Sequence, residues 1–279
     1  MLTLPGPVVD ADWLQAHHSD PALRIVDARW SLGPPAGRER YAAGHLPGAI
    51  FLDIDHDLSA PGEGPGRHPL PAPARLERVL AAAGIGDRHL VVAYDDSGGS
   101  TAARVWWLFR HFGHADRVAV LDGGIGAWTR AGGELVTEVP RHPAATWTAG
   151  PARDDVVDAD AVAANGALVL DARAVERYRG EVEPIDPRAG HIPGALSAPF
   201  TDNLRSDGRF LDAATLRERY RTLGADRQPT IAYCGSGVTA AQLLLAMEVA
   251  GIDGARLYEG SWSDWSSDPA RPAATGSRP

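Results

Sequence analysis

The stretch AGHLPGA at residues 43–49 returns as AGHIPGA at residues 189–195, and this duplication decides the fold. Three more pairs of segments repeat in the same order along the chain. They are IVDARW (25–30) with VLDARA (169–174), VVAYDDSGGSTAA (91–103) with TIAYCGSGVTAA (230–241), and LDGGIGAW (121–128) with YEGSWSDW (258–265). Because both order and spacing are preserved, we interpret the chain as two copies of one domain.

The repeats also indicate where the two domains begin and end. We expect an N-terminal domain over residues 1–137 and a C-terminal domain over residues 154–266. Residues 138–153 are rich in Pro, Ala and Thr, which is typical of a linker. Residues 267–279 are rich in Pro, Ser and Ala and are predicted to form a flexible tail.

Each half alternates short apolar runs with longer helical patterns. The runs ALRIVDA, LVVAY, ALVLDA and PTIAY are predicted to be buried strands. The run LVVAY is followed by a Gly/Ser loop and an apolar helix that is predicted to end before Gly113. The run PTIAY is followed in the same way by a helix predicted to end before Gly251, since glycine commonly follows the last helical residue. This alternation predicts the α/β class, with a mainly parallel sheet flanked by helices in each domain.

Composition and charge exclude several classes of function. The 279 residues carry a net charge of −9, which is unfavourable for binding nucleic acid or an anionic membrane surface. No apolar run approaches the roughly 20 residues of a membrane span. The N-terminal stretch MLTLPGPVVDADW has no signal-peptide pattern, so a cytoplasmic location is expected. With one cysteine, the chain has no internal disulfide and no cysteine-rich metal site.

The single cysteine, Cys234, follows a predicted buried strand and precedes a helix, where α/β sheets place their ligands. An isolated cysteine is commonly just a small buried hydrophobe. Here, however, the loop residues Gly235, Gly237, Val238 and Thr239 are expected to turn successive backbone N–H groups toward one point. Together with the positive end of the helix, these groups favour a reactive thiolate and a bound persulfide anion.

The motif CGSGVTA at residues 234–240 and the duplicated AGH-x-PGA blocks resemble the tandem-domain rhodanese-type sulfurtransferases, over nearly the whole chain. The motif is similar to the active loop of the 3-mercaptopyruvate sulfurtransferases. The resemblance implies two rhodanese-like domains, of which only the second is catalytic. The position that matches Cys234 in the first half is Asp95, and because a carboxylate cannot accept a sulfane sulfur, that half is predicted to be silent.

The resemblance also implies polar residues that assist the cysteine. A serine, histidine and aspartate arrangement of such enzymes maps onto Ser236, His68 and Asp55, although the PGEGPG segment lengthens the separation of the last two. A hydroxyl supported by an imidazole and a carboxylate can donate to a developing enolate or carbonyl oxygen. A loop histidine without a role is the alternative for His68. His45 and His191 occupy equivalent positions in the two copies and are expected to brace loops.

The residues beside the cysteine bear on the sulfur donor. Thiosulfate-selective relatives carry basic side chains just after the cysteine, whereas Gly235 and Ser236 are neutral, which favours 3-mercaptopyruvate. Thiosulfate remains the alternative main donor. The resemblance maps Arg177 onto a substrate-binding arginine, and Arg188 is the candidate for the second one, with an altered spacing. Arginine suits this role because its planar fork pairs with a carboxylate through two hydrogen bonds.

Two other arginines of the second half are assigned to structure. Arg179 is expected to be a solvated surface charge. Arg173 is expected to pair within its own domain because it has a twin, Arg29, in the silent half.

The predicted reaction passes sulfur from a small anionic donor to Cys234 and then to a thiol acceptor such as thioredoxin, or to cyanide, without a metal or an organic cofactor. A cysteine phosphatase is a rival reading, but it requires an arginine six positions after the cysteine, where this chain has Ala240. A non-catalytic sulfur-binding or docking module is the other rival. The retained loop around Cys234 argues against that reading for the whole chain.

Overall fold

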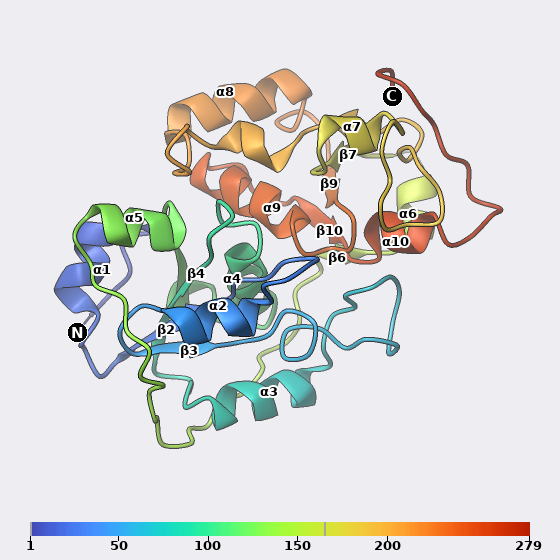
Figure 1. Cartoon of the computed structure of the whole chain (residues 1–279). Helices are drawn as coiled ribbons and strands as arrows, with labels where there is room; N and C mark the ends of the chain where they lie inside the picture. The colour runs from blue at the N-terminus through green and yellow to red at the C-terminus, as the bar shows by residue number, and fades with distance from the viewer. Residues whose placement is uncertain (1, 165) are drawn as a thin grey trace. The chain divides into compact units, whose positions relative to one another are not determined.

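A computed structural model describes residues 2–164 and 166–279, and the chain forms two compact units (Figure 1). The first unit contains Met1–Ser59, Pro71–Arg153 and Arg205–Phe210. The second contains Ala60–Leu70, Asp154–Leu204 and Leu211–Pro279. A short segment of each sequence half therefore belongs to the unit formed mainly by the other half.

The first unit is built on a five-stranded sheet in the order β1-β5-β4-β2-β3, in which all paired strands are parallel. Its strands are β1 (Val8–Val9), β2 (Leu23–Asp27), β3 (Ala49–Phe51), β4 (Leu90–Tyr94) and β5 (Val118–Leu121). Its helices are α1 (Ala11–His17), α2 (Gly37–Ala43), α3 (Pro73–Ala82), α4 (Ala102–His111), the 3₁₀ turn η1 (Ala115–Arg117) and α5 (Gly124–Arg130).

The second unit repeats this topology, with a parallel sheet in the order β6-β10-β9-β7-β8. Its strands are β6 (Val156–Val157), β7 (Leu168–Asp171), β8 (Leu196–Ser197), β9 (Thr230–Tyr233) and β10 (Arg256–Tyr258). Its helices are α6 (Ala159–Ala163), α7 (Val175–Tyr178), the 3₁₀ turn η2 (Phe200–Asn203), α8 (Ala213–Leu223), α9 (Ala240–Val249) and α10 (Ser261–Trp265). The predicted α/β class with two parallel sheets is confirmed.

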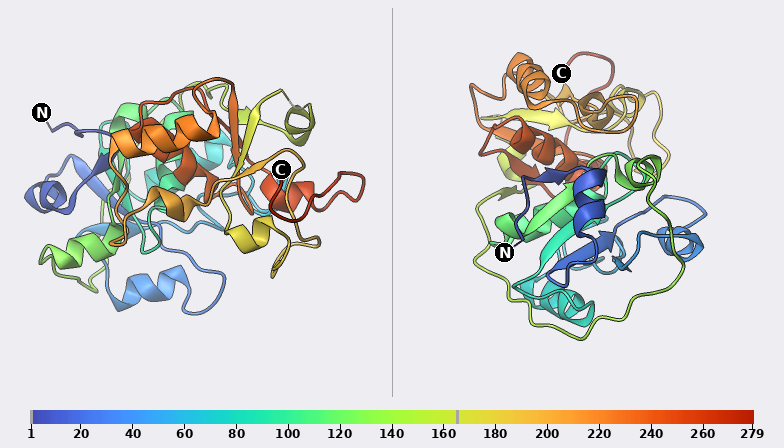
Figure 2. Two further views of the ribbon diagram at one scale, coloured as in Figure 1. Left: turned by 90° about the horizontal axis from the view of Figure 1, so that it is seen from above. Right: turned by 90° about the vertical axis from the view of Figure 1, so that its left-hand side faces the viewer.

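The central strands are apolar because helices cover both faces of each sheet (Figure 2). Every residue of β4 and β9 is buried. In the first unit, α4 packs against β4 and β5, while residues of α1 and α5 join the core on the opposite face. In the second unit, α9 packs against β9 and β10, and residues of α6 and α10 join the other core. Strands buried on both faces read as continuous apolar runs, which is why the sequence predicts them well.

A buried ion pair recurs at the same place in both sheets. Arg29 pairs with Asp27 at 2.6 Å, and Arg173 pairs with Asp171 at 2.6 Å. Burial opposes the charge of Arg173, but the adjacent carboxylate of Asp171 raises the pKa of that guanidinium above its ordinary value. The predicted structural role of Arg173 within its own domain is confirmed by these contacts.

The two duplicated histidines, His45 and His191, are also structural. Both rings are buried, and each Nδ1 lies within 2.8 Å of the carbonyl oxygen of the tyrosine on which the ring stacks. Each histidine therefore holds the loop of its own AGH-x-PGA block.

The expected linker and tail make specific contacts in the structure. In the linker, Trp147 is 3 % exposed and packs against Phe109 and Phe112. In the tail, Ala274 forms a β-bridge with His191, and the carbonyl oxygen of Arg278 lies 3.1 Å from the Nε2 of the same histidine. Both segments are therefore attached to a unit along part of their length.

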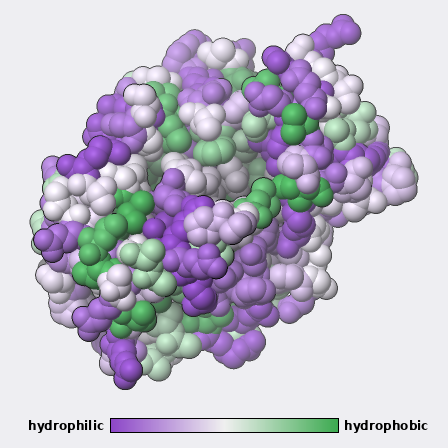
Figure 3. Space-filling view, in the orientation of Figure 1, coloured by the Kyte–Doolittle hydropathy of each residue, from purple (hydrophilic) through white to green (hydrophobic). Residues whose placement is uncertain are grey.

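The face of the molecule in Figure 3 is mostly hydrophilic, with hydrophobic residues in separate small groups. Within the described residues, no helix is long and apolar enough to cross a membrane.

Candidate active site

The cysteine lies where the carboxyl end of β9 meets the loop that leads to α9. Cys234 is 3 % exposed. Its backbone N–H donates to Ser261 Oγ at 3.1 Å, and its carbonyl oxygen accepts from the N–H of Trp262 at 3.0 Å. The next carbonyl, that of Gly235, accepts from the N–H of Ser263 at 2.9 Å. The segment after β10 therefore holds the backbone of the cysteine in place.

Ser261 has a backbone conformation that ordinarily favours glycine. Its φ is 53°, the one positive value outside glycine among the described residues. The matching residue of the first unit is Gly124, with a φ of 55°. A non-glycine residue in this region costs about 1–3 kcal/mol, and such strain is concentrated at functional sites. The Ser261 hydroxyl also donates to the carbonyl of Tyr258, so the strained residue connects β10 to the cysteine.

Sequence reasoning missed Ser261, although a signal was present. The repeat aligns YEGSWSDW with LDGGIGAW, and serine replaces glycine at residues 261 and 263, of which residue 261 has the positive φ. A polar substitution at a glycine-type position, close to the cysteine in the fold, marks a residue with a role in the site.

The loop after the cysteine needs glycine for a close backbone approach. Gly237 has a φ of 78°, and a side-chain carbon there would lie 2.3 Å from the carbonyl oxygen of Glu259. Ser236 and Val238 are buried on either side of it. The turn is thus packed against the residue that follows β10, and only glycine allows the backbone to approach so closely.

The equivalent loop of the first unit shows what this turn can bind. The carboxylate of Asp95 is buried and accepts four backbone N–H groups, at 2.9–3.0 Å, and one hydroxyl. The donors are the N–H groups of Ser97, Gly99, Thr101 and Ala102 and the Oγ1 of Thr101. A strand–loop–helix turn of this kind therefore directs its donors at an anion.

His68 and Ser236 are brought together although 168 positions separate them in the sequence. His68 Nδ1 lies 2.7 Å from Ser236 Oγ, and both side chains are buried. The contact forms because Ala60–Leu70 belongs to the second unit. The third predicted member, Asp55, belongs to the first unit, where its carboxylate accepts from Trp30 Nε1 at 2.9 and 3.0 Å. Its catalytic role stays a prediction.

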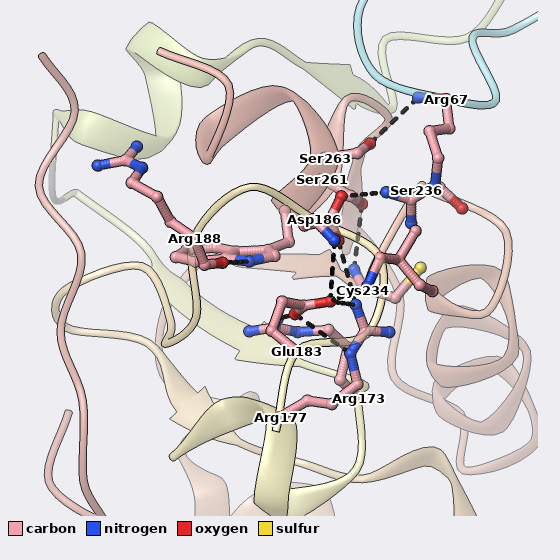
Figure 4. Close-up of polar contacts among 12 residues, drawn as sticks. Arg67, Arg173, Arg177, Glu183, Asp186, Arg188, Cys234, Ser236, Ser261 and Ser263 are labelled. Atoms are coloured by element: carbon pink, nitrogen blue, oxygen red, sulfur yellow. Dashed lines mark hydrogen bonds and ion pairs between the residues drawn. The ribbon is translucent and has the colours of Figure 1, made fainter. Parts of the chain in front are cut away.

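Arg177 lies beside the cysteine loop within a cluster of charges (Figure 4). Its Nη2 pairs with Glu183 Oε1 at 2.7 Å and with Asp186 Oδ2 at 3.1 Å. A side-chain carbon on Gly235 would lie 3.3 Å from Arg177 Nη1. Glycine at position 235 therefore leaves room for a guanidinium group next to the cysteine.

Arg67 is the second guanidinium group at this loop, and sequence reasoning did not find it. Its Nη2 would lie 3.2 Å from a side-chain carbon on Gly235, and its Nη1 is bonded to Asp186 Oδ1. Burial raises the pKa of the Asp186 carboxyl, and the positive charge of Arg67 opposes that effect. The available signal was the adjacency of Arg67 to His68 in the segment GRHPLP.

The structure does not bring Arg188 to this loop. Its guanidinium donates to four backbone carbonyls, at 2.7–3.0 Å, and Figure 4 shows it pointing away from Cys234. The acceptors are the carbonyls of Trp265, Ser266, Asp268 and Arg271. Arg188 is therefore engaged in holding the chain after α10. The side chain of Arg179 is 44 % exposed, and its Nη1 lies 3.9 Å from Glu181 Oε1.

Comparison with known proteins decides the family. Two segments, residues 10–131 and 156–268, each match the rhodanese-like domain. The chain belongs to the rhodanese family. Together the two matches include every strand of both sheets except Val8–Val9. They also contain the repeated segments. The predicted tandem arrangement is confirmed.

Curated relatives and solved structures extend the likeness to nearly the whole chain. A Pseudomonas aeruginosa protein named "Probable 3-mercaptopyruvate sulfurtransferase" is 47% identical over 278 residues, covering 96% of this chain and 98% of its own. The thiosulfate sulfurtransferase of Rattus norvegicus is 35% identical, covering 91% and 89%. The crystal structure of SseA from Escherichia coli, a 3-mercaptopyruvate sulfotransferase, superposes with a TM-score of 0.82 at 34% identity, covering 92% and 99%. This rhodanese-family chain is a sulfurtransferase enzyme.

Proposed function

We propose that the enzyme moves a sulfane sulfur from 3-mercaptopyruvate to a thiol acceptor or to cyanide, with Cys234 as the persulfide carrier. The observation that carries this proposal is the position of Cys234. It begins a glycine-containing loop between β9 and α9, and Arg177 lies against the next residue. The 47% identical relative from Pseudomonas aeruginosa, whose name specifies the same donor, supports the proposal.

In the first half-reaction, Arg177 binds the donor's carboxylate and the Cys234 thiolate attacks the donor's sulfur. A sulfur–sulfur bond forms as the carbon–sulfur bond of the donor breaks, and pyruvate leaves as its enolate. The proton of the donor's thiol ends on the enolate carbon, which yields pyruvate and the anion Cys234–S–S⁻. The Ser236 hydroxyl, 2.7 Å from His68 Nδ1, is placed to donate to the developing enolate oxygen.

The second half-reaction returns the cysteine to its thiolate. An acceptor thiolate, such as that of thioredoxin, attacks the outer sulfur and leaves with it, whereas cyanide leaves as thiocyanate. Before this step the persulfide anion needs hydrogen-bond donors. We propose that the loop at Cys234 supplies these donors. The matching loop of the first unit supports this proposal, because four of its backbone N–H groups bind the Asp95 carboxylate.

Thiosulfate is the second candidate donor, and one observation favours it. Although Gly235 and Ser236 are neutral, the guanidinium groups of Arg67 and Arg177 both lie next to Gly235 and supply positive charge from other segments. A compact dianion is attracted by two such groups. The rat relative's name specifies this donor.

The test is direct detection of the carried sulfur. The protein is incubated with 3-mercaptopyruvate or with thiosulfate, and intact-mass and peptide spectrometry are used to seek a gain of one sulfur atom on Cys234. We expect the gain with 3-mercaptopyruvate and none in Cys234→Ser. A protein that gains sulfur from neither donor would refute the proposed function. A higher kcat/KM with thiosulfate than with 3-mercaptopyruvate would make thiosulfate the main donor.

A further inference from the structure

Two guanidinium groups flank the residue that follows the cysteine. Arg67 comes from residues 60–70 and Arg177 from α7, and their Nη2 and Nη1 atoms would lie 3.2 and 3.3 Å from a side-chain carbon on Gly235. We infer that Arg67 is the second donor-binding arginine and that it grips the donor's carboxylate together with Arg177. This inference rests on the proposed function and names a residue of that same site.

The two arginines are anchored on one side and open on the other. Asp186 uses one carboxylate oxygen for Arg67 Nη1 and the other for Arg177 Nη2, and Glu183 holds Arg177 further. The atoms nearest Gly235, Arg67 Nη2 and Arg177 Nη1, have no hydrogen-bond partner among residues 2–164 and 166–279. Each group therefore keeps a donor for an incoming anion while its other donors fix the geometry.

Asp186 also shows that the spacing of the arginines suits a carboxylate. Its side chain is only 2 % exposed, whereas those of Arg67 and Arg177 are 31 % and 19 % exposed. One carboxylate thus bridges both guanidinium groups from the buried side, and the exposed side remains accessible. A second carboxylate, that of the donor, can be bound by the same pair of guanidinium groups.

The backbone around Arg67 is attached to the segment that also holds the cysteine loop. The N–H of Arg67 donates to Ser263 Oγ at 3.1 Å, and the N–H of Ser263 donates to the carbonyl of Gly235 at 2.9 Å. Gly66 has a φ of 70°, and a side-chain carbon there would lie 2.5 Å from the carbonyl oxygen of Gly260. This close approach needs glycine, and it sets Arg67 at a defined place beside Gly235.

Arg67 therefore takes the role for which the family resemblance makes Arg188 the candidate, with an altered spacing. Four of the five N–H donors of Arg188 already bond to carbonyls of the segment 265–271 within the protein. The second arginine of this enzyme is supplied instead by the segment that carries His68, and donor binding and the Ser236 contact depend on the same 60–70 segment.

The experiment measures steady-state kinetics with 3-mercaptopyruvate for Arg67→Ala, Arg67→Lys and the matched control Arg179→Ala. Loss of a charge-assisted bond should raise KM about 10- to 100-fold in Arg67→Ala, with a much smaller change in kcat. The inhibition constant of pyruvate, which has the same carboxylate but no sulfur, should rise in parallel. The KM of Arg67→Lys should lie between those of the unmodified protein and Arg67→Ala, since lysine keeps the positive charge but lacks the planar guanidinium group. A KM in Arg67→Ala equal to that of Arg179→Ala overturns the inference.

A second comparison keeps the inference testable if Arg67→Ala is unstable because Asp186 loses a partner. Asp186→Asn removes the buried charge and leaves both arginines, and the double variant Arg67→Gln with Asp186→Asn then removes one arginine from that neutral background. The double variant should have the higher KM, and equal values contradict a binding role. Sulfur gain on Cys234 of the unmodified protein separates this result from a failure of the proposed function.

Discussion

The loops at Asp95 and Cys234 occupy the same place in two copies of one fold, yet they are completed differently. In the first unit, the side chain at the end of β4 is an anion that accepts the N–H groups of its own loop. In the second unit, the side chain at the end of β9 is a thiol. The first loop thus receives an anion from its own side chain, whereas the matching loop of the second unit has no such side chain. Under the proposed function, the second loop would bind a sulfur anion instead.

The segments that support the two loops differ in a related way. Gly124 and Ser261 have nearly the same positive φ, but only the serine bonds to the backbone of the residue at the strand end. His68 contacts Ser236, whereas the matching Ser97 bonds to Ser100 within its own loop. The second unit thus has additional polar contacts at the positions that surround its cysteine.

The largest effect should come from Cys234→Ser. A hydroxyl at this position is a much weaker nucleophile and forms no persulfide, so sulfur transfer should fall by at least about 10³-fold. Turnover is measured as pyruvate released from 3-mercaptopyruvate in the presence of a thiol. Asp95→Asn is the matched control in the first unit and should keep the turnover of the unmodified protein. A large loss in the control would show that the Asp95 loop takes part in catalysis.

Asp95→Ala should act on stability rather than on turnover. Removal of the carboxylate leaves four buried N–H groups without their acceptor, and the free energy of unfolding should fall by about 3 kcal/mol. Chemical denaturation followed by tryptophan fluorescence measures this change. Asp95→Asn keeps one acceptor oxygen, so its free energy of unfolding should fall by less than that of Asp95→Ala. If the alanine variant were as stable as the unmodified protein, the carboxylate would not be what holds this loop.

Ser236→Ala should lower kcat by about 10- to 100-fold, because the variant loses the hydroxyl that we propose donates to the developing enolate oxygen, while it keeps the cysteine. The matched control is Ser97→Ala, which removes the equivalent hydroxyl from the Asp95 loop and should leave kcat unchanged. The rate of the first half-reaction is measured from the burst of pyruvate. Equal rates in the two variants would remove Ser236 from the chemistry.

The smallest effect is expected for Ser261→Gly. Relief of the positive φ and loss of the bond to the Cys234 N–H oppose one another, so the free energy of unfolding should change by less than about 1 kcal/mol. Ser261→Ala loses the bond and keeps the strain, and it should be less stable than the glycine variant by about 1 kcal/mol or more. Denaturation midpoints compare the two, and an alanine variant as stable as the glycine variant would argue against strain at this residue.

Some of the contacts that differ between the units can be predicted from the sequence, and others cannot. Ser236 was predicted from its place in the CGSGVTA motif, and its contact with His68 is present. Arg177, which the family resemblance implies as a substrate-binding arginine, lies at the loop, whereas Arg188, the candidate for the second arginine with an altered spacing, does not. Arg67 is 119 positions away from its partner Asp186, and no local pattern relates the two.

The duplicated blocks, the two parallel sheets and the place of Cys234 after a buried strand can all be read from the residues alone. Their signals are local, because apolar runs, glycine stops and repeated segments reflect contacts made within a few residues or between neighbouring strands. The partners of the charged side chains depended on the tertiary structure. A long, flexible arginine side chain is directed by the carboxylates and carbonyls that folding brings to it, and the attachment of residues 60–70 to the second unit placed Arg67, rather than Arg188, beside the cysteine.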